Sequence, residues 1–427
     1  MNQTVSRARR LHGAVSLPAD KSIGHRTALL SALADGRSRI ENYPSSADPQ
    51  STLNCMRQLG IPVDQDGDTV HIDGQGLNGL SAPDAPLDCG NSGTTMRLLS
   101  GILAGQPFGS VLTGDASLRS RPMARIADPL NAMGAEVTLT DGHAPIHIIG
   151  GAALQGMTYP LPIASAQVKS CVLLAGLFAE GTTTVIETTP SRDHTERMLG
   201  LDAQTTDGER HLTVEGGHRI PARTWHVPGD FSAAAFFLVA GSIVPGSTLQ
   251  LDGVGMNPSR NALLEVLRSM GADIAVANER MKGGEPIADL TVRHAALTGA
   301  RVTDPLIPNL IDEVPVLAVA AACATGHTEI RDAAELRVKE TDRLDAMAQN
   351  LRALGADVEE FEDGLAIEGP ASLTGATVSS FDDHRIATAM GVAGLVAEGT
   401  TTVTDADCAS VSFPGFWEEL HAVTASS

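Results

Sequence analysis

The sequence is poor in cysteine. Its five cysteines are scattered, and no two of them form a Cys-x-x-Cys pair: Cys55, Cys89, Cys171, Cys323 and Cys408. This spacing argues against a disulfide framework and against a thiolate metal site, and it suits a reducing cytosol. Residues 1–17 hold arginines but no apolar signal-peptide segment, and no apolar run approaches the length that spans a membrane. We therefore expect a cytoplasmic protein.

Positive charge is scarce as well. The formal net charge is −21, which argues against nucleic acid and against an anionic membrane as partners. The chain has only four lysines, and three of them fall in unusual polar stretches: Lys21, Lys169, Lys282 and Lys339. His143 and His147 are four residues apart, but their stretch is strand-like and contains proline. We interpret these histidines as surface residues and expect no bound metal.

The length predicts more than one domain. A chain of 427 residues exceeds an ordinary single core, so two domains are the default. With 42% hydrophobic residues, the chain has enough apolar surface to fold as a globular protein.

Two patterns recur along the chain, and both are typical of α/β structure. The first is an apolar helix with a polar or glycine-containing start, followed by a short β-branched run; it occupies residues 21–40, 91–112, 165–185, 230–251, 312–330 and 383–403. The second is an amphipathic helix that ends near glycine and precedes a hairpin. Its helices end at Gly60, Gly134, Gly200, Gly271 and Gly355. The hairpin turns are predicted at residues 66–67, 141–142, 207–208, 283–284 and 363–364.

Six copies of the first pattern meet five complete copies of the second. The last helix, predicted at 413–423, has no hairpin after it, so we expect the N-terminus to supply the missing strand through Leu11, Val15 and Leu17. Six units divide into two domains of three, residues 20–227 and residues 1–19 with 228–427. Helices at 314–324 and 386–397 are apolar all round, which predicts buried helices and outer sheets.

Residues 336–344 are the most unusual stretch. They place Arg337, Lys339, Glu340 and Arg343 beside a helix predicted at 341–354, with Thr341 as its N-cap. Basic groups at a helix N-terminus form an anion site, and a carboxylate held there can transfer protons. A solvated ion-pair network explains this stretch alone equally well.

The other buried helices also begin with charged or short polar residues. These starts are Lys21 to Arg26, residues 90–95, Ser165 to Lys169, residues 312–313 and residues 382–385, with further basic groups at Arg119, Arg121, Arg125 and residues 191–194. Any one of them could be ordinary capping. Together they predict a positive site for a ligand with several negative charges, in the cleft between the domains. Asp312 and Glu340 are the candidates for acid and base.

These motifs resemble the 5-enolpyruvylshikimate-3-phosphate synthase (3-phosphoshikimate 1-carboxyvinyltransferase) family over essentially the full chain. The matching runs are Lys21-Ser22 with Arg26, and residues 91–94, 121–123, 165–167, 336–344 and 383–385. The resemblance implies a two-domain inside-out α/β barrel, each domain built from three βαβαββ-like units. It implies transfer of the enolpyruvyl group of phosphoenolpyruvate to the 5-hydroxyl of shikimate 3-phosphate, in the shikimate pathway of aromatic amino acid biosynthesis, by addition and elimination through a tetrahedral ketal.

The resemblance also implies the site residues. Catalysis would fall to Asp312, Glu340 and Lys21. Shikimate 3-phosphate would contact Lys21, Ser22, Arg26, Ser165, Ala166, Gln167, Ser191, Arg192, Asp312 and Lys339. Phosphoenolpyruvate would contact Lys21, Gly93, Thr94, Arg121, Gln167, Arg343, His384 and Arg385. It further implies a monomer that needs no metal or organic cofactor, and inhibition by glyphosate in competition with phosphoenolpyruvate.

Four positions depart from one branch of that family: Ala166, His194, Glu335 and Val411. Two other readings stay open. UDP-N-acetylglucosamine enolpyruvyl transferases share the fold and the donor, but they carry a reactive cysteine in the loop where this chain has Ser117. A non-catalytic binder of anionic metabolites is the other reading, and the titratable groups at Asp312 and Glu340 speak against it.

Overall fold

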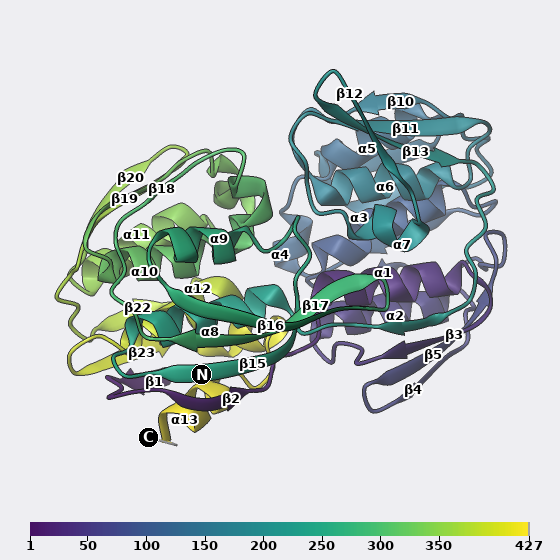
Figure 1. Ribbon diagram of the computed structural model, residues 1–427. Coiled ribbons are helices and arrows are strands. Elements are labelled where there is room, and N and C mark those ends of the chain that lie inside the picture. The colour runs from purple at the N-terminus through teal and green to yellow at the C-terminus, as the bar shows by residue number, and fades with distance from the viewer. Residues whose placement is uncertain (426–427) are drawn as a thin grey trace. The chain divides into compact units, whose positions relative to one another are not determined.

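A computed structural model describes the chain from residue 1 to residue 425. The chain divides into two compact units, Ala19–Val227 and a second unit made of Met1–Pro18 with Pro228–Ser427. Figure 1 shows the elements of both units. Within residues 1–425, no helix combines the length and apolarity needed to cross a membrane.

The unit Ala19–Val227 contains three four-stranded sheets of one design. In each sheet a short strand runs parallel to the strand that follows a buried helix, and a hairpin completes the sheet. The first has the order β14 (Thr224–His226), β3 (Asp35–Glu41), β5 (Thr69–Gln75) and β4 (Val63–Asp66). The second is β6 (Leu87–Asp88), β7 (Ser110–Thr113), β9 (His143–Ile149) and β8 (Glu136–Thr140). The third is β10 (Thr158–Pro160), β11 (Thr182–Glu187), β13 (Glu209–Glu215) and β12 (Ala203–Thr206).

Three buried helices fill the middle of this unit, and the sheets surround them (Figure 1). They are α1 (Lys21–Ala32), α3 (Gly93–Ala104) and α6 (Ala166–Gly176). The second helix of each repeat is α2 (Ala47–Gln58), α5 (Ala124–Ala132) or α7 (His194–Leu199), and a short α4 (Ala116–Arg119) precedes α5.

The other unit repeats the design. Its sheets are β16 (Asp273–Lys282), β17 (Glu285–Arg293), β15 (Thr248–Gly255) and β2 (His12–Val15); β18 (Arg301–Val302), β19 (Gly326–Ile330), β21 (Gly364–Gly369) and β20 (Asp357–Phe361); and β1 (Gln3–Ser6), β23 (Thr400–Thr404) and β22 (Thr377–Ser379). Its helices are α8 (Phe231–Ile243), α9 (Ala262–Ser269), α10 (Val314–Cys323), α11 (Arg343–Ala353), α12 (His384–Gly394) and α13 (Phe416–Ala425). Short 3-10 helices are η1 (Ile307–Asn309), η2 (Ile311–Glu313), η3 (Ala334–Val338) and η4 (Ala406–Val411).

The predicted burial of the first-pattern helices is confirmed. All residues of α8 and α12 are buried, and so is α10 from Val314 to Ala322. A helix without a polar face has no stable position at the surface. Glycine lets such helices pack closely: a Cβ at Gly391 would lie 2.8 Å from the Trp417 ring.

The prediction for the N-terminal strand is partly wrong. The strand that completes the sixth sheet is β1, where Val5 faces Thr401 across an antiparallel pair with β23. Leu11 and Val15 belong to the region of β2, which pairs in parallel with β15 in another sheet. The N-terminus therefore contributes a strand to each of two sheets. The prediction missed β1 because it considered only the apolar residues from 11 to 17, whereas the buried apolar residue of β1 is Val5, which is 3% exposed.

The predicted turns are mostly confirmed. The five predicted helix-end glycines all have positive φ, from 70° to 100°. Asp141 and Gly142 join β8 to β9 with φ of 50° and 79°, as a two-residue hairpin turn requires. Two pairs are displaced by one residue: Gly67 and Asp68 join β4 to β5, and Gly364 already belongs to β21. The last helix begins at Phe416 rather than 413, because Pro414 and Gly415 (φ 84°) precede it.

We predict that Phe416→Ala destabilises its unit strongly. Phe416 is 1% exposed, and its ring centroid lies 5.9 Å from that of Phe237 on α8 and 5.5 Å from that of Phe413. Loss of a buried phenyl ring typically costs about 3–5 kcal/mol. Urea unfolding followed by circular dichroism measures the change, with Met281→Ala, an exposed side chain, as control. Equal unfolding midpoints for the two variants would contradict the predicted contribution of the Phe416 ring to stability.

Candidate functional site

Helix α11 begins at Arg343, and the prediction of Thr341 as its N-cap is wrong. Asp342 is the N-cap, because its side chain accepts from the Asp345 amide at 3.1 Å. The residues before it are also less irregular than predicted, since η3 covers Ala334–Val338. Arg337 pairs with Asp342 at 2.7 Å and with Glu360 on β20 at 3.0 Å, so it attaches the helix start to the sheet.

Arg343 lies inside a ring of three carboxylates. Its Nε donates to Asp383 Oδ2 at 2.7 Å, its Nη2 to Glu340 Oε2 at 2.6 Å and its Nη1 to Asp312 Oδ1 at 3.2 Å. The guanidinium is almost fully buried. Burial lowers its pKa, but the charges of Asp383, Glu340 and Asp312 outweigh burial and raise the pKa above its ordinary value. Asp312, Glu340 and Arg343, predicted as site residues, are therefore brought together.

Arg385 joins the same cluster from the first turn of α12. It donates to the backbone carbonyl of Asp312 at 3.1 Å, and its Nη2 lies 3.6 Å from the Asp312 carboxylate. Glu313, the residue after Asp312, is buried, and its Oε1 lies 3.7 Å from Arg385 Nη1. The same oxygen accepts from Arg260 Nη1 at 2.8 Å. Ser232, at the start of α8, donates to Glu313 and accepts from Arg260. Three helix starts, those of α8, α10 and α12, thus meet around buried charges.

Two predicted residues lie near this cluster in sequence and differ in exposure. His384, the first residue of α12, is 7% exposed. Lys339 is partly exposed and donates to Glu335 at 2.8 Å, one helical turn earlier.

The other unit holds a second group of predicted residues at the start of α1. Lys21 donates to Asp48 Oδ2 at 2.9 Å, on α2. Arg26 is buried and donates to Thr195 Oγ1 at 2.7 Å, to Ser170 Oγ at 2.9 Å and to the carbonyl of Ser22 at 2.9 Å. Lys21 and Arg26 lie about one and a half turns apart on α1, which is buried from Ile23 to Ala32.

A chain of hydroxyl groups connects the starts of α1, α2 and α3. His25 Nδ1 lies 2.7 Å from Thr52 Oγ1, which lies 2.7 Å from Thr95 Oγ1, which donates to Ser92 Oγ at 2.8 Å. His25 is fully buried, and its pKa lies well below the ordinary value because of burial and the charges of Lys21 and Arg26.

Gly93, the first residue of α3, faces two arginines. A Cβ on Gly93 would lie 3.0 Å from Arg97 Nη1 and 3.4 Å from Arg121 Nη1. Arg97 donates to Gln167 Oε1 at 2.5 Å, and Gln167 Nε2 donates to Thr94 Oγ1 at 3.0 Å. Gly93, Thr94, Arg121 and Gln167 were predicted together, and the structure brings them together.

The start of α6 is capped by Ser165, whose hydroxyl accepts from the Val168 amide at 3.4 Å, so Ala166 is the first helical residue. Ser191 is buried, and its hydroxyl donates to Glu187 Oε1 at 2.5 Å. Its neighbour Arg192 is partly exposed. The sequence left Ser191 and Arg192 as alternatives; the structure gives the Ser191 hydroxyl an internal acceptor.

Sequence reasoning missed Asp48, Arg97 and Arg260. Arg97 carried a usable signal, since it stands four residues after Gly93 on an otherwise apolar helix. Asp48 and Arg260 carried none, because each reaches its partner only through tertiary packing.

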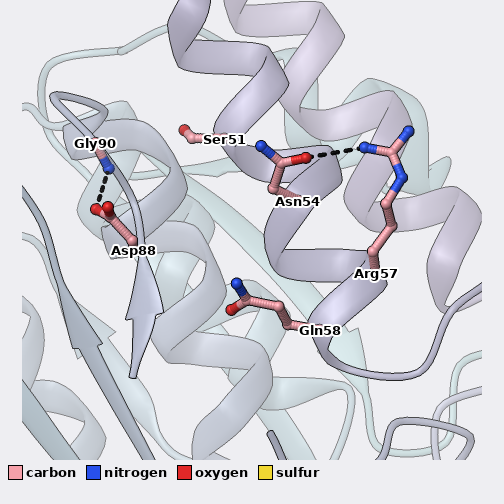
Figure 2. A pocket seen from close by; sticks show the side chains of 6 residues that line it. All are labelled: Ser51, Asn54, Arg57, Gln58, Asp88 and Gly90. Carbon is pink, nitrogen blue, oxygen red and sulfur yellow. Dashed lines mark hydrogen bonds between the residues drawn. The ribbon is translucent and has the colours of Figure 1, made fainter. Parts of the chain in front are cut away.

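Figure 2 shows a surface pocket of about 450 Å³ between α2 and the turn that follows β6. Its lining residues are Ser51, Asn54, Arg57, Gln58, Asp88 and Gly90. Of these, only Gly90 belongs to a stretch predicted to contribute to the site, residues 90–95. Within the described part of the chain, no group of three or more His, Cys, Asp or Glu could hold a metal ion.

The arrangement suits a reaction of anionic small molecules, because buried cations at helix starts lie beside carboxylates that can exchange protons. The fold is that of the enolpyruvyl transferases. It matches the enolpyruvyl transferase NikO from Streptomyces tendae with a TM-score of 0.79 over 98% of this chain and 96% of that chain, at 22% identity.

Closer similarities define the family. The family model of EPSP synthase (3-phosphoshikimate 1-carboxyvinyltransferase) matches residues 5–420. A 3-phosphoshikimate 1-carboxyvinyltransferase from Salinibacter ruber is 67% identical over the whole of both chains, and one from Herpetosiphon aurantiacus is 51% identical over 98% of each. EPSP synthase from Acinetobacter baumannii superposes with a TM-score of 0.87 at 43% identity, over 99% of this chain and 98% of that chain.

The chain belongs to the EPSP synthase family. The family and the fold predicted from the motifs are thereby confirmed, and the chain is an enzyme, a transferase of this family.

We predict that His25 makes the protein less stable in mild acid. A histidine that is neutral when folded takes up a proton on unfolding once the pH falls below its unfolded pKa of about 6.5, so the unfolded state binds more protons. The free energy of unfolding should fall by about 1.4 kcal/mol per pH unit below about pH 6 from this group, until the lowered folded pKa is reached.

Urea unfolding of the wild type and of His25→Asn, at about pH 7.5 and about pH 5.5, isolates this contribution. The asparagine keeps a polar atom near the position of Nδ1 but does not titrate. His12→Asn, at an exposed position, is the control and should keep the wild-type pH dependence. A His25→Asn variant as acid-sensitive as the wild type would contradict the assignment.

Proposed function

We propose that this chain transfers the enolpyruvyl group of phosphoenolpyruvate to the 5-hydroxyl of shikimate 3-phosphate and releases phosphate. The observation that carries the proposal is the cluster of Arg343 and Arg385 with Asp312 and Glu340, where two cations suited to a carboxylate lie beside two titratable carboxylates. The 5-hydroxyl oxygen adds to C2 of phosphoenolpyruvate, its proton passes to a base, and the methylene carbon gains a proton. Loss of phosphate and of one methyl proton from the resulting ketal then forms the enol ether.

Arg343, Arg385 and His384 bind the carboxylate of phosphoenolpyruvate in this proposal. Arg343 already holds three carboxylates, so the incoming one competes with Asp312 or Glu340 for the guanidinium. The displaced side chain is then available for proton transfer next to the substrate, with Asp312 serving the 5-hydroxyl and Glu340, together with Lys21, serving the methylene carbon.

The phosphate of phosphoenolpyruvate binds at the start of α3, where backbone N–H groups and the helix dipole favour an anion. Lys21, Gly93, Thr94, Arg121 and Gln167 form this subsite. Supporting it, Gln167 is already fixed by Arg97 and Thr94 at 2.5 and 3.0 Å.

Shikimate 3-phosphate contacts the other predicted residues and shares Lys21, Gln167 and Asp312 with the groups described above. Arg192 is the better ligand of the 3-phosphate, because the Ser191 hydroxyl donates to Glu187. The other contacts are Lys21, Ser22, Arg26, Ser165, Ala166, Gln167, Asp312 and Lys339. These residues are divided between the two units, so the reaction draws on both. We propose further that the enzyme acts as a cytosolic monomer on small-molecule substrates alone.

Phosphate release tests the proposal. Purified protein incubated with phosphoenolpyruvate and shikimate 3-phosphate should release phosphate, and the rate should be unchanged in EDTA. UDP-N-acetylglucosamine in place of shikimate 3-phosphate should give no release. Turnover of the sugar nucleotide would instead support the related transferase, and no release with either acceptor would support a binding protein.

We predict that Glu340→Gln and Asp312→Ala reduce kcat far more than they weaken substrate binding. Loss of a positioned acid or base typically costs about 10²–10⁴-fold in rate. Steady-state kinetics measure kcat, and substrate titration calorimetry measures binding. Glu368→Gln, which changes an exposed carboxylate on β21, is the matched control and should keep the wild-type kcat. Near-normal kcat in either site variant would remove that residue from the mechanism.

We predict that Gly93→Ala raises the inhibition constant of glyphosate more than the KM for phosphoenolpyruvate. The added methyl would lie 3.0 Å from Arg97 Nη1 and 3.4 Å from Arg121 Nη1, so it crowds the phosphate subsite. Glyphosate is longer than phosphoenolpyruvate, and one methyl group can discriminate ligands by roughly 10–200-fold.

Inhibition kinetics with the wild type and Gly93→Ala test this. Gly109→Ala is the control, since its added methyl would meet its nearest neighbour at an ordinary 3.4 Å. Equal increases in both constants would show that Gly93 does not discriminate between the two ligands.

A further inference from the structure

A buried ionic cluster lies beneath the loop that carries Ser191 and Arg192. Lys169, on α6, is fully buried, and its ammonium donates to Glu187 Oε2 at 3.1 Å, to Glu196 Oε1 at 2.7 Å and to the carbonyl of Ser191 at 3.2 Å. These three bonds use all three donors of the ammonium group. The mechanism assigns Lys169 no role, so its burial needs another explanation.

Glu187, the last residue of β11, completes the hold on Ser191. One of its oxygens accepts from both the Ser191 amide at 3.1 Å and the Ser191 hydroxyl at 2.5 Å. The other accepts from Lys169 and from Arg210 at 3.3 Å. Ser191 is therefore held through its amide, its carbonyl and its side chain at once.

Helices α6 and α7, which the Lys169–Glu196 pair connects, are joined a second time, one residue later on α6 and one residue earlier on α7. Ser170 on α6 lies 2.6 Å from Thr195 on α7, and Arg26 donates to both hydroxyl groups, at 2.9 and 2.7 Å. The Lys169–Glu196 pair thus stands directly behind the contact that orients Arg26. One buried assembly supports both Arg26 and the residue before Arg192.

The cluster balances its own charge, since Lys169 and Arg210 face Glu187 and Glu196. Burial raises the pKa of Glu196, and Lys169 opposes that shift. A buried ion pair is often no more stabilising than apolar side chains of similar volume, whereas removing only one partner of the pair is strongly destabilising. Stability alone is therefore a weak reason for this arrangement, and its fixed directions toward Ser191 are the stronger one.

We infer that Lys169, with Glu196, is a positioning residue for shikimate 3-phosphate: it fixes the Ser191–Arg192 loop and the α6–α7 contact that orient Arg192 and Arg26. The inference rests on the proposed function. It distinguishes binding of the acceptor from binding of the donor, because the cluster supports Arg192 and Arg26, which are both assigned to shikimate 3-phosphate. The Arg343 and Arg385 cluster assigned to the donor's carboxylate belongs to the other unit.

The test compares Lys169→Met with the charge-balanced double variant Lys169→Met/Glu196→Gln and with Lys169→Arg. Small misplacements of binding groups cost up to about 10²-fold, so KM for shikimate 3-phosphate should rise by roughly 10- to 100-fold in the Met variants, with KM for phosphoenolpyruvate little changed. Lys169→Arg keeps the charge and should recover part of the affinity. Where Lys169→Met does not fold, the double variant carries the comparison.

Calorimetric titration with shikimate 3-phosphate alone measures the same loss without turnover. Arg280→Met/Asp289→Asn, which neutralises an ion pair at 3.3 Å on the β16–β17 hairpin, is the control and should change neither KM. A fall in melting temperature with both KM values unchanged, or an equal rise in both, would overturn the inference and leave Lys169 a structural residue. Failure of the proposed function is distinguishable, because the wild type itself would then release no phosphate.

Discussion

A helix that is apolar on every side can be stable in water only when its whole length is covered, and this constraint governs the protein. Helices α8, α10 and α12 in one unit, and α1, α3 and α6 in the other, are each covered by sheets and by neighbouring helices. Their sides are largely used in packing, so their charged side chains lie within their first two turns. Side chains cap most of these starts: Asp20, Ser92, Ser165, Asp230 and Asp383.

The same constraint explains why so few basic residues suffice in a chain of net charge −21. At a helix start, a cation stands beside unpaired N–H groups whose partial charge has the same sign, so nearby carboxylates are needed to keep it there. Arg343 has three such carboxylates, and Lys21 has Asp48. The acidic composition and the cationic site are therefore compatible, because carboxylates balance cations such as Arg343 and Lys21 locally.

Local rules predicted the parts of the fold that depend on local physics. Asp141-Gly142 predicted its hairpin turn, since a two-residue turn needs positive φ at both positions. Local rules could not choose between Thr341 and Asp342 as N-cap, because both side chains can cap a helix. The pairing of Arg337 with Asp342 and with Glu360 on β20 depends on tertiary structure, which local rules do not describe. Nor could they find β1, whose pairing with β23 joins residues about four hundred positions apart.

The candidate site divides in the same way. Lys21, Gly93, Ser165 and Asp312 could be predicted because each lies at the start of a buried helix. Asp48 and Arg260 could not, because they lie on α2 and in the loop before α9 and meet their partners only after packing. Packing also decides selectivity. Because three carboxylates already neutralise Arg343, a ligand with one negative charge gains little binding energy there. A ligand with several charges that contact several helix starts gains binding energy at each helix start. The internal carboxylates thus favour substrates with several negative charges. Both substrates of the proposed reaction carry several negative charges.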